Sequence, residues 1–297
     1  MDRTTKGLLA IVACAVLWST GGLFIKLVAW HPMVIAGSRS LVAAVFLASL
    51  RLLSGRSRKP LKAGTEAGTR AGTEKNHAAM YGAAAAYAAT MLIFVAANKL
   101  TASANVILLQ YSAPVYAALL GWLLVKEKPR IEHWLALAAV CFGLTLFFKD
   151  GLKGGSFLGD GLAVISGVTF GAYSVFMRMQ KNGRPEDSIL LAHIVTAAIG
   201  LPFALVAPPL LELKSVAAIL ALGIFQIGIA SLFFAYGIRR VSAVQAMLTA
   251  VAEPLLNPVW VLLATGERPG AAAIAGGGVI LTAVTVSSIW GVRRQRR

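Results

Sequence analysis

Residues 113–129 read APVYAALLGWLLVKEKP, and residues 253–269 read EPLLNPVWVLLATGERP. Each stretch carries a proline at its second position and ends in the triplet Glu-basic-Pro, at 127–129 and 267–269. Between these markers both stretches are predominantly apolar, which is typical of a membrane-spanning helix. The sequence therefore contains an internal repeat, and each copy includes an apolar span with a proline inside it.

The composition of the whole chain agrees with a membrane location. Of the 297 residues, 58% are hydrophobic and 13% are charged, and the mean hydropathy is +0.74. Soluble globular domains carry roughly 25% charged residues, so this chain has too little charge to cover its surface in water. Cys14 and Cys141 lie inside apolar runs and predict no disulfide framework, and the four histidines lack the spacing of a metal site. We therefore expect no metal ion and no cofactor.

Charged residues delimit ten apolar segments of roughly 20 residues, the length that crosses the hydrocarbon core of a bilayer as a helix. The predicted spans are 7–27, 33–53, 78–97, 102–124, 131–148, 159–178, 188–207, 216–238, 243–264 and 270–291. The fold class is therefore an all-α integral membrane protein with ten transmembrane helices. The polar stretch 54–77 is rich in Gly and basic residues, which predicts a flexible basic cytoplasmic loop.

The repeat divides the spans into two groups of five. Five crossings reverse the direction of the chain, so the second copy inserts with the opposite orientation to the first. We assign residues 7–150 to the first repeat and residues 159–291 to the second. Inverted repeats of this kind build secondary transporters, whose substrate site lies near the bilayer midplane between the halves.

The basic residues predict the orientation in the membrane. Most of the 28 lysines and arginines fall between spans on the side that carries both termini. The exceptions are Arg39 inside the second span and these residues on the opposite side: Lys26, Lys99, Lys149, Lys153, Lys214 and Arg268. By the positive-inside rule, both termini of this multi-pass protein face the cytoplasm across the inner (plasma) membrane. The net charge of +16 thus reflects topology and does not predict nucleic-acid binding.

Glu253 is the sharpest candidate for a functional group, because it lies near the middle of the ninth span. A carboxylate there costs at least about 2.5–3.5 kcal/mol on insertion scales. The matching position of the first repeat is Ala113, so a structural need shared by both halves does not explain the acid. Glu253 could bind an amine or exchange a proton, which makes a proton the candidate coupling ion. The structural alternative is a buried partner for Arg39 or for a helix N-terminus.

Other polar residues recur with Glu253 every four positions along the ninth span: Gln245, Thr249 and Asn257. On a helix of 3.6 residues per turn they form one polar stripe, which would face a cavity or another helix. Pro254 and Pro258 in this span remove two backbone donors. The carbonyl groups left over could bind a ligand, or the helix could simply kink. We group Pro254, and Pro114 at the matching position of the fourth span, with Glu253 and Arg39 as candidates for coupling or gating.

The remaining candidates lie in several spans. Arg39 could bind a carboxylate through two hydrogen bonds, snorkel to the external headgroups or stabilise a loop. The other candidates for the substrate site are Trp18, Tyr87, Asn98, Asn105, Tyr173 and Gln226. Asn105 matches Gln245 in the register of the repeat, which favours a place along the pathway. Trp18 in mid-membrane needs a partner for its indole N–H, and it suits a cavity wall or helix packing equally well.

Several short motifs occur together in a characteristic order. They are Leu17-Trp18-Ser19, Arg39, Glu253-Pro254 and the duplicated Glu-basic-Pro triplets at 127–129 and 267–269. In this order the chain resembles the EamA branch of the drug/metabolite transporter superfamily over nearly its whole length. The resemblance implies a ten-helix carrier with a central cavity formed mainly by helices 1, 3, 4, 6, 8 and 9. It also implies export, or less often import, of amino acids or other small metabolites. We therefore expect a secondary active transporter that works by alternating access, in the export direction.

Alternative functions fit less well. A cationic drug or amine exporter stays open, because Glu253 and Trp18 could hold a cation. An intramembrane enzyme needs a nucleophile with a base, paired acids or a metal cluster, and the sequence shows no HExxH, no GxSG-type serine and no paired intramembrane aspartates. A channel or receptor does not predict an inverted duplication. The small residues of the fifth and tenth spans are typical of helix packing, either within a monomer or between the subunits of a homodimer.

Overall fold

The computed structural model describes residues 2–53, 66–101, 103–149, 156–265 and 270–295, and over these residues the chain is all-helical. Within these ranges only the backbone is described for 22–23, 26, 66–76, 98–99, 103–104, 257–258, 261–262, 264–265 and 291–295.

The five spans of each half are formed by one helix or by consecutive helices. The first half contains α1 (Arg3–Ser19) with α2 (Gly21–Lys26), α3 (Pro32–Leu53), α4 (Glu66–Leu100), α5 (Ser103–Gln110) with α6 (Ala113–Leu120) and the π-helical η1 (Gly121–Val125), and α7 (Ile131–Phe147). The second half contains α8 (Phe157–Met179), α9 (Pro185–Gly200) with α10 (Phe203–Val206), α11 (Leu213–Ala221) with η3 (Leu222–Ile229) and α12 (Ala230–Ile238), α13 (Ala243–Ala250) with α14 (Ala252–Thr265), and α15 (Ala271–Gln295). The prediction of ten transmembrane helices is confirmed. Among the described residues, seven helical segments are long and apolar enough to cross a membrane by length and composition alone.

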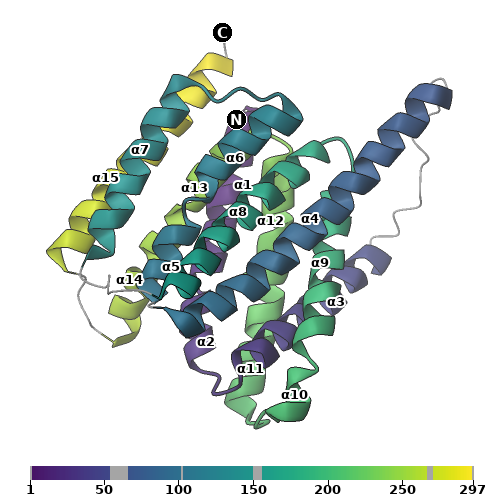
Figure 1. Cartoon of the computed structure of the whole chain (residues 1–297), viewed down its shortest axis with the longest axis vertical. Coiled ribbons are helices and arrows are strands. Elements are labelled where there is room, and N and C mark those ends of the chain that lie inside the picture. Colours follow the sequence, from purple (N-terminus) through teal and green to yellow (C-terminus); the bar gives the residue numbers. More distant parts are fainter. Residues whose placement is uncertain (1, 54–65, 102, 150–155, 266–269, 296–297) are drawn as a thin grey trace.

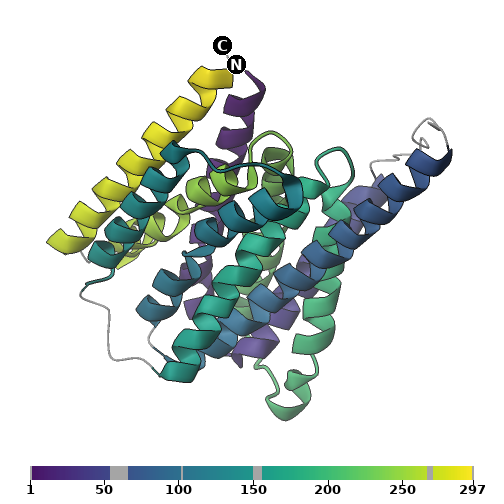
Figure 2. The ribbon, with the colours of Figure 1, turned by 45° about the horizontal axis from the view of Figure 1, so that its top comes forward.

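The two halves interlock (Figure 1), and their contacts are related in pairs by a pseudo-twofold axis. Two helices of the first half pack against the equivalent helices of the second half: α3 packs against α9, and α7 packs against α15. The other large contacts come in reciprocal pairs: α4–α8 with α12–α1, α4–α9 with η3–α3, α5–α8 with α13–α1, and α6–α8 with α14–α1. The start of α1 and the end of α15 lie at the same end of the molecule (Figure 2). Because the main interfaces all join one half to the other, each repeat depends on the other for its packing.

Helices on the pseudo-twofold axis approach so closely that only glycine fits at the crossing. A Cβ atom at Gly37 of α3 would lie 2.6 Å from the backbone nitrogen of Leu201, which follows Gly200 of α9. A Cβ atom at Gly276 of α15 would lie 2.5 Å from the carbonyl oxygen of Gly143 in α7. The small residues of the fifth and tenth spans therefore form a packing surface within one chain. A homodimer stays a prediction.

One predicted boundary differs from the structure. Residues 66–77, expected to belong to a loop over 54–77, are helical and extend α4 at its N-terminal end, while 54–65 lie outside the described residues. Glu66 and Arg70 are spaced one helical turn apart, and alanines separate the polar residues. Both features support a helix, even where the segment is too polar to enter the membrane.

We expect Gly37→Ala to lower the free energy of unfolding by about 1–3 kcal/mol, because the new methyl group would press on the backbone of α9. Gly161→Ala in α8 is the matched control, since a Cβ atom there meets nothing within 4 Å. Alanine favours helix over glycine, so the control should keep or raise stability. Thermal unfolding in detergent measures both variants, and equal melting temperatures would contradict the close crossing.

Candidate functional site

Two helix breaks at equivalent positions of the repeat lie at the centre of the bundle. The fourth span is interrupted at Tyr111 and Ser112, between α5 and α6, and the ninth span is interrupted at Val251, between α13 and α14. A proline follows each break, Pro114 in α6 and Pro254 in α14. Proline has no N–H for the carbonyl group four residues earlier, so the regular helix cannot continue through these positions.

A cavity of about 250 Å³ lies beside these breaks and is lined by residues from seven spans. Its polar lining residues are Arg39, Tyr87, Thr90, Gln110, Tyr111, Gln226 and Glu253. Its apolar lining includes Trp18, Ile25, Met91, Phe94, Ile107 and Phe170. The lining elements include spans 1, 3, 4, 6, 8 and 9, as the family resemblance implied, together with span 2 through Arg39. The cavity therefore lies between the two halves of the repeat.

The Glu253 carboxyl is held by a residue of the opposite half. The Tyr111 hydroxyl donates a hydrogen bond of 2.6 Å to Glu253 Oε2. Tyr111 stands at the break of the fourth span and Glu253 two residues after the break of the ninth, so the two broken spans meet at this bond. Tyr111 is not among the site residues predicted from the sequence. The sequence did carry a signal for Tyr111, because the repeat register aligns it with Val251, two positions before Glu253. Only the fold, however, brings the Tyr111 hydroxyl to the Glu253 carboxyl group.

Arg39 lines the same cavity and does not snorkel to the membrane surface. Its side chain is buried, with 8% of the residue exposed. One terminal N–H group donates to the Met91 sulfur at 3.3 Å, which is a weak acceptor, and Nε has no hydrogen-bond partner in the described part of the chain. Among the described residues, no ion pair within 4 Å joins Arg39 to Glu253. A base and an acid thus share one cavity without neutralising each other by direct contact.

An aromatic stack forms one wall of the cavity. The Trp18 ring lies 5.9 Å from Phe170 and 5.5 Å from Phe234, centroid to centroid. Behind this layer, the Tyr173 ring stacks 4.4 Å from Tyr87 and 5.3 Å from Phe234. Such ring pairs are stabilising beyond their area of contact. The ends of α8 and α12 lie beside the start of α1, at the end of the bundle that carries both chain termini. Tyr173 and Phe234 lie nearer to those helix ends than Phe170 and Gln226 of the cavity lining, so the wall is on the terminal side of the cavity.

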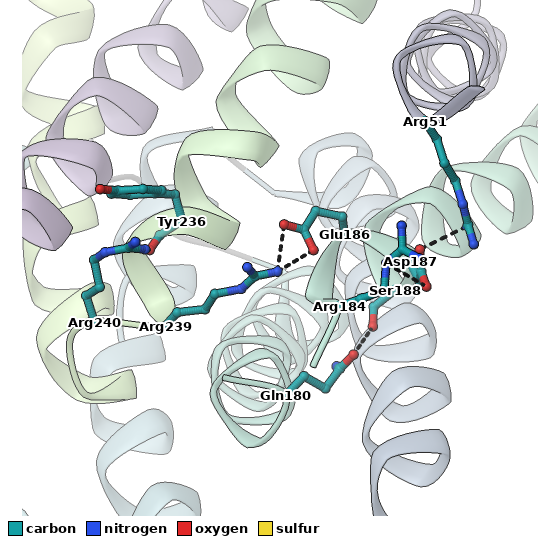
Figure 3. Close-up of polar contacts among 9 residues, drawn as sticks. All are labelled: Arg51, Gln180, Arg184, Glu186, Asp187, Ser188, Tyr236, Arg239 and Arg240. Carbon is teal, nitrogen blue, oxygen red and sulfur yellow. Dashed lines mark hydrogen bonds and ion pairs between the residues drawn. The ribbon is translucent and has the colours of Figure 1, made fainter. Parts of the chain in front are cut away.

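Ion pairs close that same end of the bundle. Arg178 Nε of α8 lies 2.7 Å from Oε1 of Glu127, the acid of the first Glu-basic-Pro triplet. Arg51 Nη1 of α3 lies 2.9 Å from Oδ1 of Asp187 in α9 (Figure 3). Each of these pairs joins the first half to the second. The cavity lining instead extends toward the other end, through Ile25 of α2.

The structure brings together part of the predicted site. Trp18, Arg39, Tyr87, Gln226, Glu253 and Pro254 line the cavity. Gln226 Nε2 also donates to the Trp18 carbonyl oxygen at 3.3 Å, which ties η3 to the end of α1. Tyr173 lies behind the wall and supports Tyr87 by stacking.

Other predicted residues lie elsewhere. Asn105, Pro114, Gln245 and Thr249 are buried and do not line this cavity in the described structure. The predicted polar stripe assumed one continuous ninth helix, but α13 ends at Ala250. The Thr249 hydroxyl instead donates to the Gln245 carbonyl oxygen at 2.8 Å. The side chains of Asn98 and Asn257 lie outside the described residues. No cluster of His, Cys, Asp and Glu among the described residues could hold a metal ion.

Comparison with known proteins agrees with this architecture. The pattern of the EamA-like transporter family matches residues 5–149 and 157–289, which is most of the chain. The chain belongs to the EamA-like transporter family. It is therefore a multi-pass membrane protein of a transporter family, and the intramembrane-enzyme alternative is set aside.

Individual relatives of this EamA-like chain are distant. An "Uncharacterized transporter YwfM" of Bacillus subtilis (strain 168) is 25% identical over 180 residues, which cover 59% of this chain and 61% of that protein. An "Uncharacterized transporter" of Archaeoglobus fulgidus is 27% identical over 201 residues, 67% of this chain and 72% of that protein. A solved crystal structure has a TM-score of 0.80 at 19% identity and covers 97% of this chain and 98% of its own, so it supports the fold.

We expect Tyr111→Phe to lower the free energy of unfolding by about 1–3 kcal/mol, because the partly buried Glu253 carboxyl loses its hydrogen-bond donor. In a Glu253→Leu background, Tyr111→Phe should lower the free energy of unfolding by less, since the tyrosine hydroxyl has no carboxyl acceptor there. Tyr116→Phe, on the neighbouring α6, is the control and should change stability by less than about 0.5 kcal/mol. Chemical unfolding of the four members of the cycle measures the coupling. Equal costs in both backgrounds would rule out the bond as a stabilising contact.

Proposed function

We propose that this protein is a secondary active transporter that binds a small zwitterionic metabolite, such as an amino acid, in the central cavity. The observation that carries the proposal is the pair of opposite charges, Arg39 and Glu253, which line one cavity without an ion pair between them. A zwitterion presents one carboxylate and one ammonium group at a short fixed separation. Such a ligand can satisfy both protein charges at once, which neither an anion nor a cation can do.

The chemistry of the two groups assigns an orientation to the cargo. The Arg39 guanidinium offers a planar fork of donors that matches a carboxylate. The Glu253 carboxyl accepts hydrogen bonds from an ammonium group while Tyr111 holds its other side. The remainder of the cargo would contact the apolar wall that includes Trp18 and Phe170. Ligand pockets commonly measure about 300–1,000 Å³, so a cavity of about 250 Å³ favours a metabolite over a drug-sized molecule.

A second candidate cargo is a small cationic amine without a carboxylate. Trp18 and Glu253 both line the cavity, and an aromatic face beside a carboxylate suits an organic cation. The buried positive charge of Arg39 argues against this cargo, because it would repel the ligand and stay without a counter-ion. The two candidates therefore differ in the contribution they require from Arg39.

Transport in this proposal is driven by an ion gradient or by exchange. The sequence contains no GxxxxGK[ST] motif, so direct use of a nucleotide is not expected. Glu253 is the candidate carrier of a coupled proton, because a carboxyl within the membrane can hold or release one as its surroundings change. Export from the cytoplasm is the direction that we propose.

The inverted repeat supports alternating access. The described conformation is closed at the terminal end by the aromatic stack and by the Arg178–Glu127 and Arg51–Asp187 pairs. By the positive-inside rule this end faces the cytoplasm, so we interpret the conformation as outward-facing. In inverted-repeat carriers the opposite state arises when one part of the bundle rocks against the other around a fixed site. Opening the cytoplasmic end would then require these pairs to separate.

We expect Glu253→Gln to abolish coupled transport without preventing membrane insertion. We expect Arg39→Gln to weaken phenylalanine binding about 10–100-fold, because the cargo carboxylate loses a charged hydrogen-bond partner. Proteoliposomes loaded with phenylalanine, phenethylamine or 3-phenylpropanoate compare zwitterion, cation and anion with the same ring. The wild type should prefer phenylalanine, and Arg39→Gln should remove its advantage over phenethylamine. Normal flux and pH dependence in Glu253→Gln would contradict the role of the acid. A wild-type preference for phenethylamine would favour the amine carrier.

We expect Glu127→Gln to raise the reactivity of the buried Cys14 thiol about fivefold, because loss of the Arg178 pair favours an open cytoplasmic end by about 1 kcal/mol. Labelling with a thiol reagent in a Cys141→Ala background measures this change. Exchanging the charges, Glu127→Arg with Arg178→Glu, should restore slow labelling. Lys181→Gln, which removes an exposed cation just after α8, is the control. Unchanged labelling in Glu127→Gln would show that the pair does not hold this end closed.

A further inference from the structure

A second hollow lies on the outer face of the bundle, away from the central cavity. It is a groove of about 650 Å³ between α7 and α15, the two helices that pack side by side at the edge of the molecule (Figures 1 and 2). Small residues form much of its lining, among them Ala136, Ala139, Ala275, Gly278 and Ala283. Leu135 on one rim is 58% exposed, so the groove opens onto the surface that meets lipid. Its apolar lining suits an acyl chain.

One end of this groove is polar, which an acyl chain alone does not explain. Glu132, in the first turn of α7, lines the groove and is 6% exposed. Ser287 of α15 also lines it and is 3% exposed, and its Oγ has no hydrogen-bond partner in the described part of the chain. A buried hydroxyl without a partner costs free energy unless a ligand supplies one. Trp290 lines the same end, and a tryptophan ring commonly marks the headgroup level of a bilayer.

A basic side chain lies next to the polar end. Arg130 Nη1 is 3.7 Å from Glu132 Oε1, and the Arg130 side chain is 51% exposed. Most of its N–H groups can therefore reach a phosphate at the membrane surface. The groove thus ends in an exposed cation and a buried carboxylate beside a hydroxyl. The order of these charges matches a headgroup with a phosphate followed by an ammonium group.

We propose that the α7–α15 groove binds one phospholipid whose headgroup carries a primary amine, as in phosphatidylethanolamine. An acyl chain lies along the small residues, the phosphate meets Arg130, and the ammonium group donates hydrogen bonds to Glu132 and to Ser287 Oγ. A choline headgroup has no N–H to donate, and a glycerol headgroup has no positive charge for the carboxylate. The site therefore selects the amine among lipids with the same chains. It is separate from the central cavity and does not depend on the proposed transport function.

Binding of defined lipids to the purified full chain tests this site. Phosphatidylethanolamine, phosphatidylcholine and phosphatidylglycerol with identical acyl chains are added in detergent, and native mass spectrometry measures the bound fraction. We expect the ethanolamine lipid to bind at least about tenfold more tightly than the other two, and Glu132→Gln to remove most of that preference, because a charged hydrogen bond is lost. Glu212→Gln, an exposed acid before α11, is the matched control and should keep it.

Two further variants keep the test informative if Glu132→Gln folds poorly. Ser287→Ala should weaken the preference for the amine while leaving chain binding intact. Gly278→Leu should block all three lipids by filling the groove, and a Cβ atom at Gly278 meets nothing within 4 Å. Equal binding of the three lipids, or an ethanolamine preference that survives Glu132→Gln, would overturn the proposal. A dimer that cross-links through α15 and excludes lipid would overturn it as well, because a second copy would then be the occupant.

Discussion

Backbone hydrogen bonding in a lipid environment is the constraint on which this architecture depends. A helix satisfies its own backbone groups, but a break such as that at Tyr111–Ser112 leaves some of them without partners. Breaks can therefore occur only where other protein or water surrounds them. The inverted repeat meets this requirement by placing the broken fourth and ninth spans at the centre, where α8 and α1 of the opposite halves cover them. The interlocked packing of the halves follows from this need.

The same enclosure makes charge tolerable inside the membrane. Arg39 and Glu253 lie at the meeting point of the broken spans, where a cavity and the hydroxyl of Tyr111 replace some of the lost hydration. Charges in such a position are costly for folding and valuable for binding, because electrostatic contacts are stronger where water is scarce. The interhelical ion pairs gather instead at the end with the chain termini, and the α7–α15 groove stands apart from both. We therefore propose cargo binding at the centre, closure at the end that carries the chain termini and lipid contact at the outer face.

The hydrophobic pattern by itself determined the class of fold, the ten spans and the duplication. Apolar length is set by bilayer thickness, and the repeated motif at 113–129 and 253–269 is visible in the letters. The same pattern led to Glu253, because a lone acid in an apolar span is costly to insert unless it binds something. Helical periodicity could not decide whether the polar stripe faces a cavity or another helix. Gln245 and Thr249 are buried and do not line the described cavity, and the ninth span is interrupted at Val251.

Only the tertiary structure decided which of the remaining polar residues meet. Tyr111 and Glu253 are far apart in the chain, and nothing local to either residue encodes their 2.6 Å contact. The same holds for the glycine crossings and for the groove that places Ser287 near Glu132. Local sequence fixes the length and polarity of each helix, whereas the faces that turn toward one another result from packing all ten spans together.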